Sequence, residues 1–187
     1  MKQQEQELKI SLTQDQYQAL VGDAVGQVQE NFYFYTPNPD VMVRIRQKNC
    51  VFQLTVKRRI SQTGGVWLCD EHNQTIDQKY AQILVDKGIS AQILNQTFEL
   101  GLTGNFPFAG MLKTIRTKKQ FDQFILEIDK NEYLGVCDFE LECEHQSSQE
   151  LQRLILMLKQ AYDIDYCPSL AKSQRFFQRL KENVTQN

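Results

Sequence analysis

The chain of 187 residues carries 21 Lys and Arg against 23 Asp and Glu, and 41% of its residues are hydrophobic. This length suits one domain with a substantial core, so we treat residues 1–187 as a single domain. The near-neutral charge argues against nucleic-acid binding, no apolar run is long enough to span a membrane, and no signal peptide follows Met1, so we expect a cytoplasmic protein.

In the first half of the chain, runs of alternating polar and apolar residues predict β-strands. The runs are residues 3–12, 28–35, 41–47, 50–57 and 66–72. A helix separates the first two strands, because Thr13-Gln14-Asp15-Gln16 fits a capping box that marks a helix start. Short turns separate the later strands: two prolines interrupt residues 36–40, and Gly64-Gly65 precedes the fifth strand. These turns predict antiparallel hairpins.

The second half of the chain mixes helices with further strands. The predicted helices are residues 76–87, residues 90–95, one capped by Ser147, and residues 169–183. The predicted strands are residues 97–103, 111–121, 124–129 and 135–144. About eight strands, mostly joined as hairpins, leave exposed sheet edges unless the sheet closes on itself. We therefore expect an α+β fold, a closed eight-stranded antiparallel β-barrel with flanking helices.

Several predicted strands carry full charges at every second residue, so each of them has one charged face. Glu5, Glu7 and Lys9 show the pattern on the first strand. The other charged alternates include Arg44, Arg46, Lys57, Glu127, Asp129, Glu140 and Glu142, with basic residues also at 113–119.

The charged faces have two interpretations. If they point into the barrel, the lumen is a wet tunnel whose cations suit phosphates and whose carboxylates suit Mg²⁺ or Mn²⁺. Apolar alternates such as Val43 and Ile128 then need cover, which helices outside the barrel can supply. The alternative places the charges outside, where cross-strand ion pairs contribute little stability.

Seven motifs, in order from residue 5 to residue 176, resemble those of the CYTH superfamily of triphosphate tunnel metalloenzymes. They are Glu5-Gln6-Glu7-Leu8-Lys9, residues 31–37, Val43-Arg44-Ile45-Arg46, Leu54-Thr55-Val56-Lys57, Thr117-Lys118-Lys119, residues 133–142 and residues 171–176. The chain is similar to the small stand-alone bacterial branch, which is related to thiamine triphosphatases, inorganic triphosphatases and class IV adenylate cyclases.

The resemblance implies a tunnel that holds a triphosphate, with Mg²⁺ or Mn²⁺ as cofactor. The implied phosphate-binding residues are Lys9, Arg44, Arg46, Lys57, Lys119, Lys172 and Arg175. The implied metal ligands are Glu5, Glu7, Asp129, Glu140 and Glu142. The implied catalytic residues are Glu7, Glu140 and Lys57.

Three positions depart from the pattern of the family, and the first, Tyr35 in place of the usual aspartate, is expected to affect packing more than chemistry. Lys119 stands where an arginine is common, which keeps the charge but loses the forked donor, and Arg116 and Lys118 share the face opposite to it. Cys69 occupies a position that is often acidic, and Glu71 follows two residues later. A complete catalytic set therefore depends on how these two strands are placed.

The leading hypothesis is metal-dependent hydrolysis of a triphosphate, such as inorganic tripolyphosphate, a nucleoside triphosphate or thiamine triphosphate. A class IV-type adenylate cyclase that makes cyclic AMP from ATP is the first alternative. A polyphosphate- or nucleotide-binding protein without catalysis is the second. The expected partner is a small-molecule triphosphate rather than nucleic acid or a membrane, and the sequence leaves monomer or homodimer open.

Overall fold

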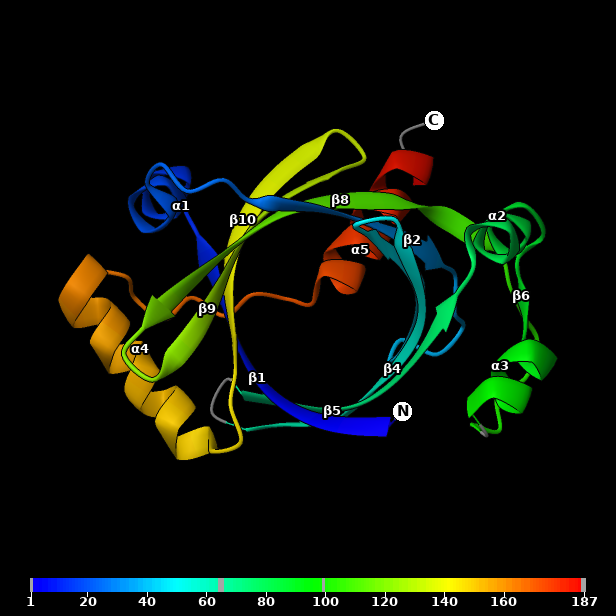
Figure 1. Ribbon diagram of the computed structural model, residues 1–187, viewed down its shortest axis with the longest axis horizontal. Coiled ribbons are helices and arrows are strands. Elements are labelled where there is room, and N and C mark those ends of the chain that lie inside the picture. Colours follow the sequence, from blue (N-terminus) through cyan, green and yellow to red (C-terminus); the bar gives the residue numbers. More distant parts are fainter. Residues whose placement is uncertain (1, 64–65, 99, 186–187) are drawn as a thin grey trace.

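The computed structural model describes residues 2–63, 66–98 and 100–185, and describes side chains at residues 6–61, 68–98 and 100–185. A closed antiparallel barrel of eight strands forms its centre, as Figure 1 shows. Around the barrel the strands follow the order β1 (Lys2–Leu12), β10 (Val136–Glu144), β9 (Phe124–Tyr133), β8 (Phe108–Phe121), β2 (Gln27–Phe34), β3 (Val41–Lys48), β4 (Val51–Thr63) and β5 (Val66–Ile76). β5 pairs with β1 and closes the sheet. The predicted α+β barrel is confirmed.

Two layers of helices flank the barrel on opposite sides (Figure 1). The first layer consists of α1 (Gln14–Val21) and α4 (Ser148–Tyr162), and the second of α2 (Gln78–Lys87) and α3 (Ala91–Phe98). A short ribbon of β6 (Ile89–Ser90) and β7 (Asn105–Phe106) adjoins the second layer. A further helix, α5 (Lys172–Thr185), follows at the carboxyl end. No helix in the described ranges is long and apolar enough to cross a bilayer.

The apolar alternates of the strands face outward and pack under these helices. Leu8, Ile10, Ile128 and Leu141 form one core together with apolar residues of α1 and α4. A second core joins the outer face of β3 and β4 to α2 and α3, and its strand members include Val43, Ile45, Leu54 and Val56. Because side chains alternate across a strand, the charged alternates of the same strands point into the barrel.

Local signals start the helices where the sequence predicts. At α1 the Thr13 hydroxyl accepts a bond of 3.2 Å from the backbone N–H of Gln16, whose side chain accepts 2.9 Å from the N–H of Thr13. Ser147 caps α4 by accepting from the N–H of Glu150 at 3.3 Å. Each bond satisfies a donor that the first helical turn leaves unpaired.

The predicted strand at residues 97–103 is wrong. Its first two residues end α3, and residues 100–103 form no strand. The side chain of Asn95 instead satisfies both backbone groups of Leu102, with bonds of 2.7 and 2.8 Å. Gly101 and Gly104 have φ values of 64° and 86°, a left-handed backbone that an extended strand excludes.

The helix α5 packs into one end of the barrel (Figure 1). Its Phe176 is fully buried against Tyr33, Leu112 and Tyr133, which project inward from β2, β8 and β9. Gly110 makes room for this ring, because a Cβ there would lie 2.8 Å from Cζ of Phe176. This apolar cluster closes one end of the barrel, and the charged residues occupy the remainder.

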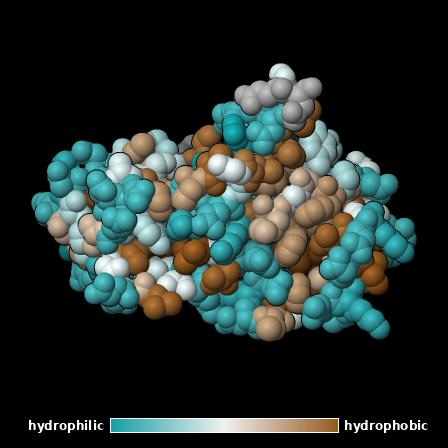
Figure 2. Space-filling model, turned by 90° about the horizontal axis from the view of Figure 1, so that it is seen from above, coloured by the Kyte–Doolittle hydropathy of each residue, from teal (hydrophilic) through white to brown (hydrophobic). Residues whose placement is uncertain are grey.

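The outer face of β2 and β8 is left partly open between the two helical layers. Val28, Phe108 and Met111 on these strands remain 47%, 41% and 39% exposed. Seen from this side, apolar residues gather near the middle of the surface, with mostly polar surface on either side (Figure 2).

Candidate functional site

Charged side chains line a cavity of about 290 Å³ inside the barrel. Its walls include the charged alternates of β1, β3, β4, β5, β8, β9 and β10, and it also reaches the first residues of α5. The interpretation that places the charged faces inside the barrel is therefore correct. The outer faces of β1, β3, β4, β9 and β10 are occupied by the apolar cores, so the charges have no room there.

One wall of the cavity is acidic. Strand register places Glu140 opposite Asp129, and Glu142 opposite Glu127, on the neighbouring strands β10 and β9. Glu7 projects from β1, the other neighbour of β10. Like charges directly opposite each other on a sheet are destabilising. The wall is stable only because cations lie between the carboxylates.

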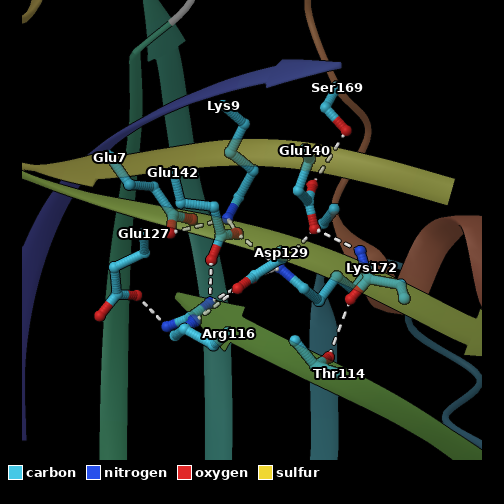
Figure 3. A network of polar contacts seen from close by, with 12 residues as sticks. Glu7, Lys9, Thr114, Arg116, Glu127, Asp129, Glu140, Glu142, Ser169 and Lys172 are labelled. Atoms are coloured by element: carbon cyan, nitrogen blue, oxygen red, sulfur yellow. Dashed lines mark hydrogen bonds and ion pairs between the residues drawn. The ribbon is translucent and has the colours of Figure 1, made fainter. Parts of the chain in front are cut away.

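Three buried cations separate these carboxylates, as Figure 3 shows. Lys9 lies 3.0 Å from Glu7 and also contacts Glu142. Arg116 binds Asp129 through two bonds of 2.8 and 2.6 Å and reaches Glu142 at 2.5 Å. Its guanidinium also contacts the carboxylate of Glu127. These forked bonds explain why an arginine suits this position better than a lysine.

The third cation is Lys172, which comes from the first turn of α5. Its Nζ lies 2.8 Å from Asp129 and 3.1 Å from Glu142, and it also contacts Glu140 (Figure 3). Arg175, one turn further on, binds both Asp138 and Glu140 at 2.9 Å. The resemblance implied phosphate binding for both residues, but here they are bound to carboxylates.

These contacts keep Glu140 and Glu142 ionised. Burial raises the pKa of Glu142, but the charges of Lys172, Lys9 and Arg116 outweigh it and hold the pKa well below the usual value. Burial likewise opposes ionisation of Glu140, yet Lys172 and Arg175 lower its pKa to about 2. Ionised carboxylates at neutral pH can orient water or bind cations, but they are weak general bases.

The opposite wall is basic, and β3 supplies its centre. Arg44 and Arg46 face the cavity from this strand, and within the described ranges neither has a carboxylate within 4.0 Å. Arg46 donates 3.1 Å to Asn31, whereas Nε of Arg44, whose side chain is 8% exposed, has no hydrogen-bond partner among the described residues. Burial, together with the charges of Arg44 and Arg116, lowers the pKa of Arg46. This wall therefore favours an anion.

Lys57 and Glu71 connect the two walls. Nζ of Lys57 lies 3.2 Å from Glu7 and 3.6 Å from Glu71. Asn73 donates 2.8 Å to Glu71, which fixes that carboxylate on β5. Cys69 also lines the cavity, and its Sγ lies 3.8 Å from Glu7. A thiol thus stands beside the glutamate at the position where the family often has an acid.

Most of the predicted site residues meet at this cavity or at its closed end. The structure brings together Glu7, Lys9, Arg44, Arg46, Lys57, Asp129, Glu140, Glu142, Lys172 and Arg175. The side chain of Glu5 lies outside the described residues, although its backbone pairs with Cys69 across β1 and β5.

Lys119 is the exception, and its predicted position is corrected. Its Nζ donates 3.0 Å to the carbonyl of Leu20 and lies 5.0 Å from the ring centroid of Tyr162, on the side of the barrel that α1 and α4 cover. Alternation along β8 turns Arg116 and Lys118 inward and Lys119 outward. Arg116 holds the inward position that the motif suggested for Lys119.

Several residues of the network were not predicted as site residues, among them Arg116, Asn131, Ser169, Thr114, Asp138 and Glu71. Arg116 and Asn131 follow from strict alternation, since each is two residues from a charged inward neighbour. Asn131 donates 3.0 Å to Asp138 and 3.1 Å to Glu140, and accepts 2.8 Å from Thr114. Ser169 donates 3.0 Å to Glu140 from an irregular segment, where no sequence signal exists.

The donors of the acidic wall fit a divalent cation. Carboxylate oxygens are the ligands that Mg²⁺ and Mn²⁺ prefer, and the buried ammonium of Lys172 shows that the cluster already surrounds a cation. In the part of the chain that the structure describes, no three acidic, His or Cys side chains converge on a metal position. Each carboxylate is directed at a lysine or arginine instead.

The comparisons with known proteins agree with this architecture. The family model of the CYTH domain matches residues 3–176. The chain is 26% identical over 163 residues to "Putative triphosphatase YjbK" of Bacillus subtilis (strain 168), which covers 83% of this chain and 82% of that protein.

Two solved structures share the fold. The crystal structure of a "putative adenylate cyclase" from Bacillus halodurans superposes with a TM-score of 0.78 at 26% identity, covering 94% of this chain and 98% of that one. The structure of "Putative adenylyl cyclase HpAC1 from Hippeastrum" gives 0.73 at 23% identity, covering 93% and 95%. Because the family match spans the barrel and the start of α5, the chain belongs to the CYTH domain family.

Proposed function

We propose that the chain, acting as a single domain, binds a triphosphate in its tunnel and hydrolyses it with the help of a divalent cation. The observation that carries the proposal is the pair on β3 formed by Arg44, which is buried, and Arg46, which is partly buried, neither with a carboxylate within 4.0 Å among the described residues. Buried charges without partners are costly. Phosphate oxygens match the forked donors of arginine, so a polyanion is the ligand that this wall favours.

The names of two relatives support a triphosphate ligand. YjbK is named as a putative triphosphatase, and the Bacillus halodurans protein as a putative adenylate cyclase. A triphosphatase and an adenylate cyclase share one requirement, which is a site for a triphosphate group. The two names differ in what attacks the phosphate chain, water in one case and a ribose hydroxyl in the other.

Phosphoryl transfer depends mainly on positioning and charge neutralisation. From β3, Arg44 and Arg46 would bind oxygens of the triphosphate. Lys57 would hold the triphosphate between the basic wall and Glu7. A divalent cation held by Glu7 and Glu142 would supply further neutralisation of the phosphate charge and polarise a phosphoryl oxygen.

Glu7 would orient the attacking water. Burial raises the pKa of its carboxyl, but the charges of Lys9 and Lys57 lower the pKa by a larger amount. The net shift is downward, so the group is ionised at neutral pH. Such a carboxylate accepts a hydrogen bond from water and aligns it for in-line attack, and it takes up the proton itself only weakly. The Phe176 cluster seals the opposite end, so the triphosphate would enter by the open mouth.

Phosphate release from a panel of triphosphates tests the proposal. The panel contains tripolyphosphate, ATP and thiamine triphosphate, each with Mg²⁺, Mn²⁺ or Ca²⁺. We expect metal-dependent release from at least one compound and a loss of roughly 10²–10³-fold in kcat for Glu7→Gln, as for other preorganised electrostatic groups. If no triphosphate is hydrolysed with any of the three metals, the proposed hydrolase activity is wrong.

An adenylate cyclase is the second candidate, favoured by the name of the Bacillus halodurans protein. Incubation with ATP separates the two activities by product, because a cyclase forms cyclic AMP and pyrophosphate whereas a triphosphatase releases orthophosphate. Tight binding of triphosphates by calorimetry, with no product after hours, would instead identify a binding protein.

A further inference from the structure

The acidic wall already contains a cation that belongs to the protein. Lys172 is only 8% exposed, and its ammonium lies among Asp129, Glu140 and Glu142. A buried ammonium is costly unless opposite charges lie close to it, and here three carboxylates from two adjacent strands lie within 3.1 Å of Nζ, although among the described residues none accepts a well-aligned hydrogen bond from it. The first turn of α5 is therefore docked onto carboxylates, whose oxygens are the ligand type that Mg²⁺ and Mn²⁺ prefer.

Glu140 shows how completely α5 and the segment before it occupy this cluster. One carboxylate oxygen accepts 3.1 Å from Asn131 and contacts Lys172. The other accepts 3.0 Å from Ser169 and 2.9 Å from Arg175. Both oxygens of a fully buried carboxylate are thus engaged, and three of the four partners come from residues 169–175. A metal ion could use Glu140 only after some of these contacts break.

We propose that Lys172 is a built-in competitor of the divalent cation, so that the cation and the docked first turn of α5 exclude each other at the Asp129–Glu140–Glu142 cluster. The inference rests on the cation-dependent function proposed above and concerns regulation of the same site. Linkage is reciprocal, so cation binding weakens the docking of this turn by the same factor by which docking weakens cation binding.

The exchange is confined to the start of the helix. Phe176 is fully buried in the apolar cluster with Tyr33, Leu112 and Tyr133, and its own contacts there are with apolar and aromatic groups. Those contacts hold the remainder of α5 while the turn at Lys172 opens, which is a local opening rather than unfolding of the helix. A released Lys172 is then available for a phosphate oxygen, the role that its motif implies.

Metal affinity measured without substrate tests the competition. Mn²⁺ alone is titrated by calorimetry into the full-length protein and into Lys172→Met. The Met variant lacks the ammonium that neutralises part of the carboxylate charge and competes with Mn²⁺. We therefore expect Mn²⁺ to bind the variant roughly ten- to hundred-fold more tightly. Lys181→Met makes the same change on an exposed residue of α5 and should leave the affinity unchanged. Lys172→Arg keeps the charge and should remain close to the unmodified protein.

Hydrogen exchange of the unmodified protein provides a second readout that needs no variant. The amides of Gln174 and Arg175 bond to the carbonyl of Ala171 at 2.8 and 3.1 Å and report on the first turn. We expect Mn²⁺ to accelerate exchange at these amides and to leave the turns beyond Phe176 unchanged. Increased protection of Gln174 and Arg175 by Mn²⁺ would overturn the inference.

Failure of the inference is distinguishable from failure of the proposed function. Equal Mn²⁺ affinity of the unmodified protein and Lys172→Met overturns the competition, while hydrolysis of triphosphates with Mn²⁺ still supports the function. Absence of Mn²⁺ binding to both proteins overturns the competition, while metal-dependent release of phosphate would still support the proposed function.

Discussion

Arg116 and Asp129 stand directly opposite each other on β8 and β9, and two bonds of 2.8 and 2.6 Å join the guanidinium to the carboxylate. Asp129 is completely buried, and Arg116 also reaches Glu142 on β10. One side chain thus ties three adjacent strands together across the floor of the acidic wall. This ion pair offsets the repulsion between the neighbouring carboxylates, so the acidic wall requires it for stability.

Replacing Arg116 tests whether this ion pair stabilises the folded protein. Arg116→Met leaves a buried carboxylate without its main partner, which should lower the free energy of unfolding by about 3–5 kcal/mol. Arg116→Lys keeps the charge but loses the fork, so its loss should be smaller. Urea unfolding at neutral pH with EDTA measures both. A loss below about 1 kcal/mol for the Met variant, as for an exposed ion pair, would contradict the assignment.

Replacing Arg44, unlike replacing Arg116, should raise the stability of the protein while lowering its activity. Arg44→Met removes a buried charge that repels Arg46 and has no carboxylate within 4.0 Å among the described residues, although it also removes a more distant cation that favours ionised Glu71. We expect the melting temperature to rise by roughly 2–4 °C, corresponding to about 1 kcal/mol. We also expect kcat/KM for the triphosphate to fall by about 10²–10³-fold. A variant that loses both stability and activity would show that Arg44 is a structural residue.

Lys119 provides a negative control for phosphate binding. Its ammonium contacts the carbonyl of Leu20 and the ring of Tyr162 outside the tunnel. Lys119→Met should therefore leave KM for the triphosphate and its dependence on salt unchanged, with only a small loss of stability. Steady-state kinetics at two salt concentrations measure this, and a several-fold rise in KM would return Lys119 to the phosphate site.

Gly110 should be intolerant of even one methyl group. Its φ is 142°, and an added Cβ would lie 2.8 Å from Cζ of Phe176, so Gly110→Ala should cost about 1–3 kcal/mol through overpacking in addition to backbone strain. Gly104→Ala is the control, because its φ of 86° is also left-handed but nothing lies within 4 Å of the added Cβ.

A shorter side chain at position 176 tests the origin of the Gly110 effect. If the clash causes the loss, Phe176→Leu should be less damaging in the Gly110→Ala background than alone. Chemical unfolding of the four proteins gives the coupling energy. Additive losses would assign the effect to the backbone conformation.

The stability of the protein should fall in acid because of Glu140. Its pKa is lowered from 4.5 to about 2 in the folded state, so its contribution to stability is complete above pH 4.5 and is lost as the pH falls towards 2. Glu140→Gln should be less stable at pH 7 and should lose less on acidification. Urea unfolding between pH 7 and pH 3 in EDTA measures the two slopes, and parallel curves would exclude Glu140 as a source of acid sensitivity.

Alternation in the sequence determined a large part of the architecture. Because successive side chains of a strand point to opposite faces, Glu7, Lys9, Arg44 and Arg46 had to share a side with the other charged alternates. The apolar alternates had to be covered from the other side. That local rule predicted one charged face on each strand, the caps at Thr13 and Ser147 predicted two of the flanking helices, and the need to remove exposed sheet edges predicted the closed barrel.

The errors arose where another rule was followed. Lys119 was selected by its motif, although alternation from Arg116 and Lys118 already turned it outward. The strand prediction for residues 97–103 gives too little weight to Gly101 and Gly104, whose backbone at positive φ interrupts a strand. In both places the local chemistry was informative, and the structure agrees with it.

The pairing of the charges was decided by tertiary structure alone. The sequence identifies carboxylates and ammonium groups on inward faces, but strand register sets which of them are opposite each other, as for Arg116 and Asp129. Lys172 reaches Glu142 from 30 residues further along the chain, because the segment before α5 pairs with β1 and carries the helix into the barrel. Ion pairs depend on distances of a few ångströms between distant segments, and closure of the barrel fixes those distances.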